Sequence, residues 1–443
     1  MQRRSFKDLL SWKNSPRRKP LLLMGARQVG KTWLMQEFGK QAFQKVAYVR
    51  FDTNAEMRRS FERDFNVKRL LSAIQLDTGV VITPEDTLMI FDEIQECPHA
   101  LTALKYFCEE APQYPLVAAG SLLGVATHVG TGWPVGKIDT LNLYPMSFTE
   151  FLTATGNELL ADALYRREWD VLSDFAPKME DLLRHYYYVG GMPAVVDAFV
   201  QHGDFSEVRV LQQQLLADYR RDFSKHAPAN EVPKLSLIWD SLPAQLAKEN
   251  KKFVCKEVRE GFRMKHLEVA LQWLLDAGMA EHVMRVSKPA LPLSGYQEAA
   301  FKAFVLDVGL LTAQCELPAR VLLEKNRVFT EFKGALTEQY VQQQLRAEMG
   351  ITPYYWTAAG GTAEIDFLFA YEGQVVPLEV KAETNLKAKS LMSYCSRYAP
   401  ALTVRCSMSG YSRQPLTDGG MLLNLPLWGI SQLTQECREM FEV

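Results

Sequence analysis

The sequence lacks the features that mark exported, zinc-binding or membrane-spanning proteins. Its seven cysteines are scattered and never form a C-x-x-C pair, so neither a structural zinc site nor a disulfide framework is indicated. There is no apolar run of about 18 residues, and the LLLM run near the N-terminus is too short for a signal peptide. We therefore expect a cytoplasmic protein that is not inserted in a membrane.

An excess of charge of one sign is also missing, because 50 Lys and Arg face 52 Asp and Glu. Any contact with nucleic acid must then come from local basic patches. Two stretches are candidates to follow a DNA backbone: RRSFKDLLSWKNSPRRKP at the N-terminus, and the basic residues from Lys251 to Lys265. Ordinary solvated charged faces are the alternative.

The pattern along the 443 residues predicts an α/β multi-domain protein. Short apolar runs alternate with amphipathic ones in residues 1–148, which predicts a parallel sheet of the P-loop ATPase type, covered by helices. Residues 149–238 have helical periodicity, interrupted at YVGGMPAVV, and are expected to form a lid or connector. Residues 239–324 have the helix, helix, hairpin order of a winged helix, and residues 325–443 form a last α/β domain.

The stretch GARQVGKT fits the phosphate-loop pattern G-x-x-x-x-G-K-[ST], between a predicted strand and a predicted helix. Its backbone N–H groups would face phosphate oxygens, Lys31 would reach the β- and γ-phosphates, and Thr32 would bind Mg²⁺. The loop residues expected to hold ATP are Gly25, Ala26, Arg27, Gln28, Val29, Gly30, Lys31 and Thr32.

A second motif, TLMIFDEIQ, supplies the carboxylates that such a site needs. A buried strand would bring Asp92 to the nucleotide edge of the sheet as a ligand of Mg²⁺, and Glu93 would orient and deprotonate the attacking water. The next strand ends at Ser121, which is either a γ-phosphate contact or a turn serine. ATP and Mg²⁺ are therefore the predicted cofactors.

A third cluster is predicted near the C-terminus, where AEIDFLF and VVPLEVK alternate apolar and polar residues. Paired across a turn, these strands place Asp366, Glu379 and Lys381 on one polar face. Asp366 and Glu379 would hold Mg²⁺ against a phosphodiester, Lys381 would activate the nucleophile, and Glu338 on the preceding helix would add a ligand. An amphipathic hairpin with a cross-strand ion pair is the alternative.

Six stretches in serial order resemble the prokaryotic AAA-type ATPases (AAA_14) that carry a C-terminal DUF4143 domain: GARQVGKT, IFDEIQ, AAGSLL, LYPMSFTEFL, YYYVGGMPAVV and FKAFVLDVGLL. The resemblance implies an additional-strand ATPase sheet, a helical lid, a winged-helix region and a restriction-endonuclease-like end of the PD-(D/E)XK type. Lys137 stands where the family often has an arginine finger. Arg220 and Arg221 are other candidates for a γ-phosphate contact, and the oligomeric state stays open.

Together these features predict an ATPase whose nucleotide state controls a nuclease-like, DNA-acting C-terminal domain. The alternative is an ATP-dependent regulatory switch or adaptor. Its C-terminal domain would then dock a protein or DNA partner without cleaving anything.

Overall fold

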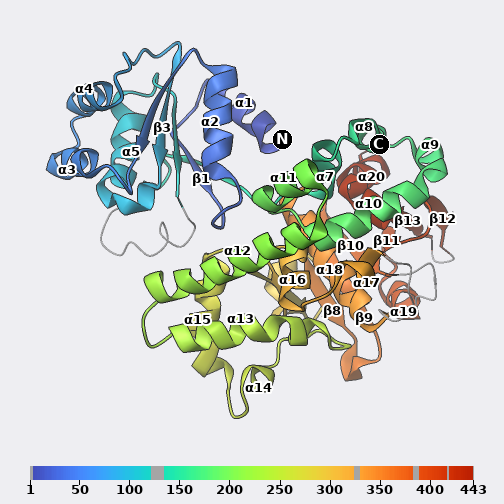
Figure 1. Ribbon diagram of the computed structural model, residues 1–443. Coiled ribbons are helices and arrows are strands. Elements are labelled where there is room, and N and C mark those ends of the chain that lie inside the picture. Colours follow the sequence, from blue (N-terminus) through green and yellow to red (C-terminus); the bar gives the residue numbers. More distant parts are fainter. Residues whose placement is uncertain (1–2, 121–133, 324–329, 383–388, 417–418, 443) are drawn as a thin grey trace. The chain divides into compact units, whose positions relative to one another are not determined.

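The structure is a computed structural model of the chain, and it describes residues 3–120, 134–323, 330–382, 389–416 and 419–442. Its contacts divide the chain into two compact units (Figure 1). The N-terminal unit comprises residues 2–144 together with 276–278, and the C-terminal unit comprises residues 145–275 and 279–443. The phosphate loop and the predicted C-terminal cluster therefore lie in different units.

A five-stranded parallel sheet forms the centre of the N-terminal unit, in the order β2-β3-β4-β1-β5. Its strands are β1 (Leu21–Met24), β2 (Lys45–Arg50), β3 (Thr87–Asp92), β4 (Leu116–Ala119) and β5 (Asp139–Asn142). Strand β4 lies between β1, which leads into the phosphate loop, and β3, which ends at Asp92. This inserted strand is the arrangement that the family resemblance implied.

Helices cover both faces of this sheet, with α1 and α2 on one side and α3, α4 and α5 on the other (Figure 1). Because both faces are covered, every residue of β3 is buried. The helices of this unit, with the 3₁₀ turn η1, are α1 (Ser5–Asn14), α2 (Lys31–Ala42), α3 (Ala55–Arg63), α4 (Val67–Thr78), η1 (Ile94–Glu96) and α5 (Pro98–Glu110).

The C-terminal unit begins with a run of helices and ends in a mixed α/β region. Its helices are α7 (Phe148–Ala154), α8 (Glu158–Tyr165), α9 (Trp169–Asp174), α10 (Ala176–Val189), α11 (Pro193–His202), α12 (Phe205–His226), α13 (Val232–Leu246), α14 (Cys255–Val258), α15 (Met264–Asp276), α16 (Val308–Gln314), α17 (Ala319–Leu323), α18 (Thr330–Ala347), α19 (Lys389–Tyr398) and α20 (Leu433–Phe441). The helices predicted as a lid or connector thus belong to the same compact unit as the C-terminal region.

A buried polar network explains why these helices join the C-terminal region. The carboxylate of Asp307 accepts hydrogen bonds from the N–H of Gly191 at 2.6 Å and from Nε2 of Gln343 at 3.0 Å. Gln343 Nε2 also donates to the hydroxyl of Tyr186 at 3.0 Å. A Cβ atom at Gly190 would lie 2.1 Å from Asp307 Oδ1, so this helix break requires glycine. Tyr186, Tyr187 and Tyr188 of α10 are all buried.

An eight-stranded mixed sheet completes the C-terminal unit, in the order β12-β13-β11-β10-β9-β8-β6-β7. Its strands are β6 (Ala280–Val286), β7 (Gln297–Val305), β8 (Tyr354–Thr357), β9 (Glu364–Tyr371), β10 (Gln374–Val380), β11 (Leu402–Ser407), β12 (Ser412–Pro415) and β13 (Met421–Pro426). Strands β9 and β10 form the predicted antiparallel hairpin, and β10 pairs in parallel with β11.

The hairpin expected to be the wing of a winged helix is part of this same sheet. Its strands β6 and β7 pair with each other, and β6 pairs in parallel with β8. The sequence could not reveal this, because the β6–β8 pairing is long-range and leaves no local pattern. The four-domain division stays a prediction, but its third and fourth segments share one sheet.

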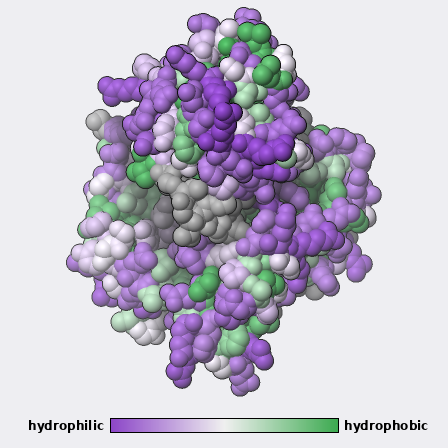
Figure 2. Space-filling model, turned by 90° about the vertical axis from the view of Figure 1, so that its left-hand side faces the viewer, coloured by the Kyte–Doolittle hydropathy of each residue, from purple (hydrophilic) through white to green (hydrophobic). Residues whose placement is uncertain are grey.

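The described residues include no helix that is long and apolar enough to cross a membrane. On the face shown in Figure 2, hydrophilic residues predominate and hydrophobic residues lie in small separate groups.

Candidate functional site

The phosphate loop connects β1 to α2 through a backbone that requires glycine at two positions. Gly25 has a φ of 156°, and a Cβ atom there would lie 2.3 Å from the carbonyl oxygen of Leu143. Gly30, directly before α2, has a left-handed φ of 94°. Between them, Gln28 also adopts a positive φ, of 64°. The loop thus curls at the N-terminus of a helix, where backbone N–H groups favour anions.

Lys31 and Thr32 are the first two residues of α2. Lys31 Nζ donates to the carbonyl oxygens of Gly25 at 3.0 Å and of Ala26 at 2.8 Å. Burial lowers the pKa of Lys31 to about 8, although the nearby carboxylates of Asp92 and Glu93 oppose the shift. The ammonium group is therefore held against the loop by neutral oxygens.

Asp92 is the buried carboxylate of this site, at the carboxyl end of β3 and only 3% exposed. Its Oδ2 accepts hydrogen bonds from the hydroxyls of Thr32 and Tyr48, both at 2.8 Å, and its Oδ1 accepts one from the N–H of Glu93 at 3.0 Å. In the described part of the chain, no lysine or arginine forms an ion pair with it. A buried carboxylate that forms no ion pair with a described lysine or arginine, and that lies beside a threonine hydroxyl, fits Mg²⁺.

Glu93 follows with an unusual backbone for a residue other than glycine. Its φ and ψ are 51° and 45°, in the left-handed region, and its Oε2 accepts a hydrogen bond from Gln95 Nε2. Such conformations cluster at functional sites because the surrounding structure must hold them. The third predicted nucleotide contact on this edge of the sheet, Ser121, lies outside the described residues.

Sequence reasoning missed three residues of this site: Tyr48 on β2, Gln95 and Arg3. Arg3 is only 7% exposed, and it donates to the carbonyl oxygens of Val29 at 3.0 Å and of Tyr144 at 2.7 Å. This arginine of the basic N-terminal stretch therefore links the phosphate loop to the segment that follows β5 through two hydrogen bonds. No local pattern distinguishes it from its basic neighbours.

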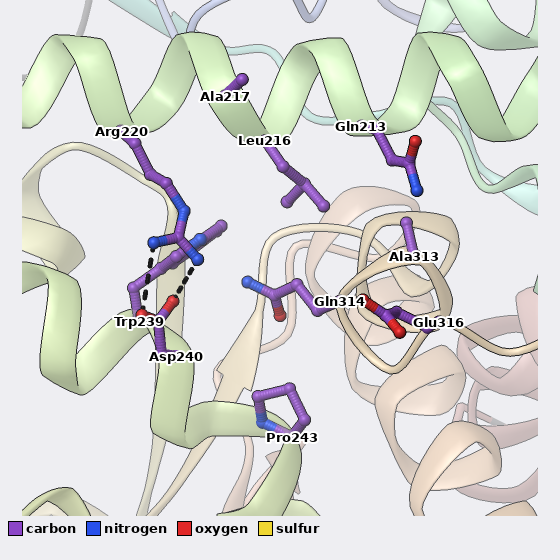
Figure 3. Close-up of a pocket in the computed structure, with 10 residues that line it drawn as sticks. All are labelled: Gln213, Leu216, Ala217, Arg220, Trp239, Asp240, Pro243, Ala313, Gln314 and Glu316. Carbon is purple, nitrogen blue, oxygen red and sulfur yellow. Dashed lines mark hydrogen bonds and ion pairs between the residues drawn. The ribbon is translucent and has the colours of Figure 1, made fainter.

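The candidate finger residues all have carboxylate partners within their own units. Lys137 pairs with Glu109 at 2.9 Å. Arg220 on α12 pairs with Asp240 on α13, at the edge of a cavity of about 420 Å³ (Figure 3). Arg221 pairs with Asp218 at 2.7 Å. These contacts are ordinary exposed ion pairs, which contribute little to stability.

The predicted C-terminal carboxylates do come together. Glu364 and Asp366 lie on β9, Glu379 lies on β10, and Glu338 lies on α18. Asp366 Oδ2 accepts a hydrogen bond from the N–H of Val380 at 2.8 Å, which ties the two hairpin strands together at this point. Burial raises the pKa of Asp366, and the neighbouring carboxylates of Glu338 and Glu379 raise it further.

Three lysines accompany these carboxylates. Lys381 pairs with Glu379, and Lys251 pairs with Glu338. Lys302 on β7, which the sequence analysis did not single out, lies among Glu338, Glu364 and Asp366. Burial raises the pKa of Glu338, but Lys302 and Lys251 more than offset this and bring it to about 2.

This arrangement does not fit the Mg²⁺ ion predicted for Glu338, Asp366 and Glu379. In the described part of the chain, no three histidine, cysteine, aspartate or glutamate side chains are grouped so as to hold a metal ion. One buried oxygen of the cluster, Glu379 Oε2, has no hydrogen-bond partner. The nuclease roles of Asp366, Glu379 and Lys381 stay predictions.

A cavity of about 540 Å³ adjoins the cluster. Its lining includes Glu364 from the cluster, Tyr355 from β8, and two basic residues, Lys252 and Arg285. The Lys302 ammonium lies 5.1 Å from the centre of the Tyr355 ring, so the cavity wall and the cluster are adjacent. Glu364 therefore belongs both to the cluster and to the lining of the cavity.

Three protein-family models match the chain. Residues 17–152 match the AAA domain AAA_14, residues 180–320 match a domain of unknown function, DUF8612, and residues 333–428 match a second domain of unknown function, DUF4143. The AAA and DUF4143 matches confirm the resemblance drawn from the motifs. The AAA domain implies nucleotide binding, typically with Mg²⁺.

The comparison with solved structures matches the chain to the following three proteins, among others. A Walker-type ATPase of Pyrococcus abyssi has 15% identity and a TM-score of 0.42, over 71% of this chain and 95% of that chain. The Orc1 protein of Aeropyrum pernix, solved in complex with DNA, has 13% identity and a TM-score of 0.28, over 72% and 92% of the two chains. Cdc6p from Pyrobaculum aerophilum has 12% identity and a TM-score of 0.24, over 72% and 93%. No protein with curated annotation matches the sequence.

Proposed function

We propose that the protein is an ATPase that binds Mg-ATP at the phosphate loop and hydrolyses it. The observation that carries the proposal is Asp92, a buried carboxylate that has only hydroxyl and N–H partners and contacts Thr32 at 2.8 Å. No lysine or arginine of the described residues forms an ion pair with it, so its oxygens can turn to a metal ion. The AAA domain match over residues 17–152 supports the same conclusion.

Each residue of the site has one task in this reaction. The N–H groups of the loop from Gly25 to Gly30 bind phosphate oxygens, and Lys31 turns from the loop carbonyls to the β- and γ-phosphates. Thr32 and Asp92 would hold Mg²⁺, which supplies charge neutralisation at the phosphates. Glu93 orients the attacking water and accepts its proton.

The test compares nucleotide binding and ATP hydrolysis in matched variants. Glu93→Gln should bind ATP as the wild type does but lose a factor of about 10²–10⁴ in turnover, because only the general base is removed. Lys31→Ala should lose binding itself. Lys40→Ala, an exposed lysine on the same helix, is the control and should change neither. Equal turnover in Glu93→Gln and wild type would show that Glu93 is not the base.

For the C-terminal unit, we infer a switch that responds to nucleotide and does not cleave its partner. The observation that favours this function over nuclease activity is the pairing of Glu338, Glu364 and Glu379 with lysines. A carboxylate oxygen that faces a buried ammonium group must give up that ion pair before it can bind a metal ion, and breaking a buried pair is costly.

Nuclease activity is the second candidate, and the unpartnered Oε2 of Glu379 supports it. The assay is cleavage of single-stranded DNA, double-stranded DNA and RNA with Mg²⁺ or Mn²⁺, with and without ATP. Wild type and Glu379→Ala are compared. We expect no cleavage by either. Cleavage by wild type that Glu379→Ala abolishes would establish the nuclease.

A further inference from the structure

Lys302 is the most deeply buried charged group of the C-terminal cluster. It is 0% exposed, and its ammonium lies 2.7 Å from Glu364 Oε1, 3.3 Å from Glu338 Oε2 and 3.9 Å from Asp366 Oδ1. These partners come from β9 and α18, and Lys302 itself comes from β7. Burying an ammonium is costly unless several acceptors surround it, so this convergence of oxygens is a built cation site.

The oxygens that a metal ion would need are already in use. Both oxygens of Glu338 face ammonium groups, because Oε1 pairs with Lys251 and Oε2 pairs with Lys302. Asp366 uses Oδ2 for the N–H of Val380. Glu379 uses Oε1 for Lys381 and keeps only Oε2 without a partner. A divalent ion such as Mg²⁺ takes six oxygen ligands, of which one or two come from carboxylates, and here an ion must displace an ammonium group to reach Glu338 or Glu364.

We propose that Lys302 is the resident cation of this cluster and occupies the volume in which Glu338, Glu364 and Asp366 would otherwise bind a divalent metal ion. The C-terminal domain therefore binds no divalent ion at Glu338, Glu364 and Asp366. The positive charge of Lys302 belongs to the chain itself, so a chelator cannot remove it. The inference concerns the C-terminal unit alone and does not rest on the proposed ATPase activity.

Replacing Lys302 by alanine should convert the cluster into a metal site. The change removes the ammonium and leaves three carboxylates around the vacated volume, next to the cavity that Glu364 lines. Mn²⁺ is the probe, because it binds carboxylate oxygens and its binding can be counted by electron paramagnetic resonance. All proteins should carry Asp92→Asn, so that the ATP site does not contribute a carboxylate.

The expected result is one bound Mn²⁺ per chain in Lys302→Ala and none in the parent at the same Mn²⁺ concentration. Lys381→Ala is the matched control. It also removes an ammonium from the cluster but leaves Lys302 among its three partners, so it should gain no site. The melting temperature of Lys302→Ala should fall in EDTA and rise again with Mn²⁺, whereas that of the parent should respond to neither.

Two results would overturn the proposal. One is a Mn²⁺ site in the Asp92→Asn parent that the further change Asp366→Asn removes. A metal ion would then bind to the cluster although Lys302 is present. The other is a folded Lys302→Ala protein that gains no Mn²⁺ site. If Lys302→Ala does not fold, the parent measurement decides alone: absence of Mn²⁺ and EDTA effects supports the proposal. Cleavage is not the readout, so failure here is distinct from failure of the proposed ATPase or switch.

Discussion

The two units contain buried carboxylates in opposite electrostatic settings. In the N-terminal unit, Asp92 is held by two hydroxyls and one N–H, and Lys31 contacts carbonyl oxygens rather than carboxylates. In the C-terminal unit, Glu338 is held by two ammonium groups. Neutral hydrogen-bond donors orient a carboxylate without neutralising its charge, whereas a lysine in an ion pair neutralises it. The difference supports the Mg²⁺ site proposed for the first unit and the lysine-neutralised cluster proposed for the second.

The largest expected difference between the two units appears when one carboxylate is removed from each and the free energy of unfolding is measured. Glu338→Gln leaves Lys302 buried with fewer counter-charges, and it should cost about 3–5 kcal/mol, the range for breaking a buried pair. Asp92→Asn should cost less than about 1.5 kcal/mol, because the hydroxyls of Thr32 and Tyr48 can rotate to accept from the new amide. Hydrogen exchange of α18 and β3 peptides reports each unit separately.

The effect of Glu338→Gln should depend on pH in one direction. Because the pKa of Glu338 is lowered to about 2, its contribution is complete above its usual value of 4.5 and is lost as the pH falls toward 2. The difference between wild type and variant should therefore shrink through this window. A difference that stays constant down to pH 2 would show that lost packing, and not lost charge, causes the effect.

The sequence predicts the nucleotide site better than the C-terminal cluster, because the residues of the nucleotide site belong to short contiguous motifs. The phosphate loop is one contiguous motif, and Asp92 follows from a buried strand that ends at the nucleotide edge. The alternation in β9 and β10 likewise predicts that Asp366 and Glu379 share a face. Lys302 comes from β7, and only the long-range pairing of β6 with β8 brings that hairpin into the sheet. No local sequence pattern could therefore predict that Lys302 neutralises the cluster.

Arg3 offers the next largest effect, within the nucleotide unit itself. Its guanidinium holds two carbonyl oxygens, and one of them belongs to Val29 of the phosphate loop. Arg3→Ala should loosen the loop and weaken ATP binding by about tenfold, since a hydrogen bond from a charged group contributes about 1.5–3 kcal/mol. Titration of a fluorescent ATP analogue measures the change. Arg17→Ala, an exposed arginine of the same basic stretch, should leave affinity unaltered.

Arg3→Lys refines this test, because one ammonium cannot reproduce the fork that reaches two carbonyl groups. It should bind ATP with intermediate affinity. If Arg3→Ala and Arg17→Ala bind ATP equally well, the N-terminal stretch has no part in shaping the loop.

The pH dependence of ATP binding should sharpen the contrast between the lysines of the two units. Lys31 has a pKa of about 8, so its ammonium form predominates below pH 8 and is lost above it. ATP binding needs the charged form, and the Kd should therefore rise about tenfold between pH 7 and pH 9. In Lys31→Arg the guanidinium stays charged, and its Kd should be flat over the same range. A flat profile in the wild type would mean that Lys31 keeps its proton.

The smallest expected effect tests whether neutral donors are what keeps Asp92 ready for Mg²⁺. Tyr48→Phe deletes one of the two hydroxyls on Asp92 Oδ2, so the carboxylate is less firmly oriented. The Mg²⁺ concentration for half-maximal ATP hydrolysis should rise about 2–10-fold, as expected for one hydrogen bond of about 0.5–1.5 kcal/mol. Tyr106→Phe, which alters a ring stacked on Phe65, is the control. A lower Mg²⁺ requirement would mean that Tyr48 competes with the ion, and Asp92 would then resemble the neutralised carboxylates of the C-terminal cluster.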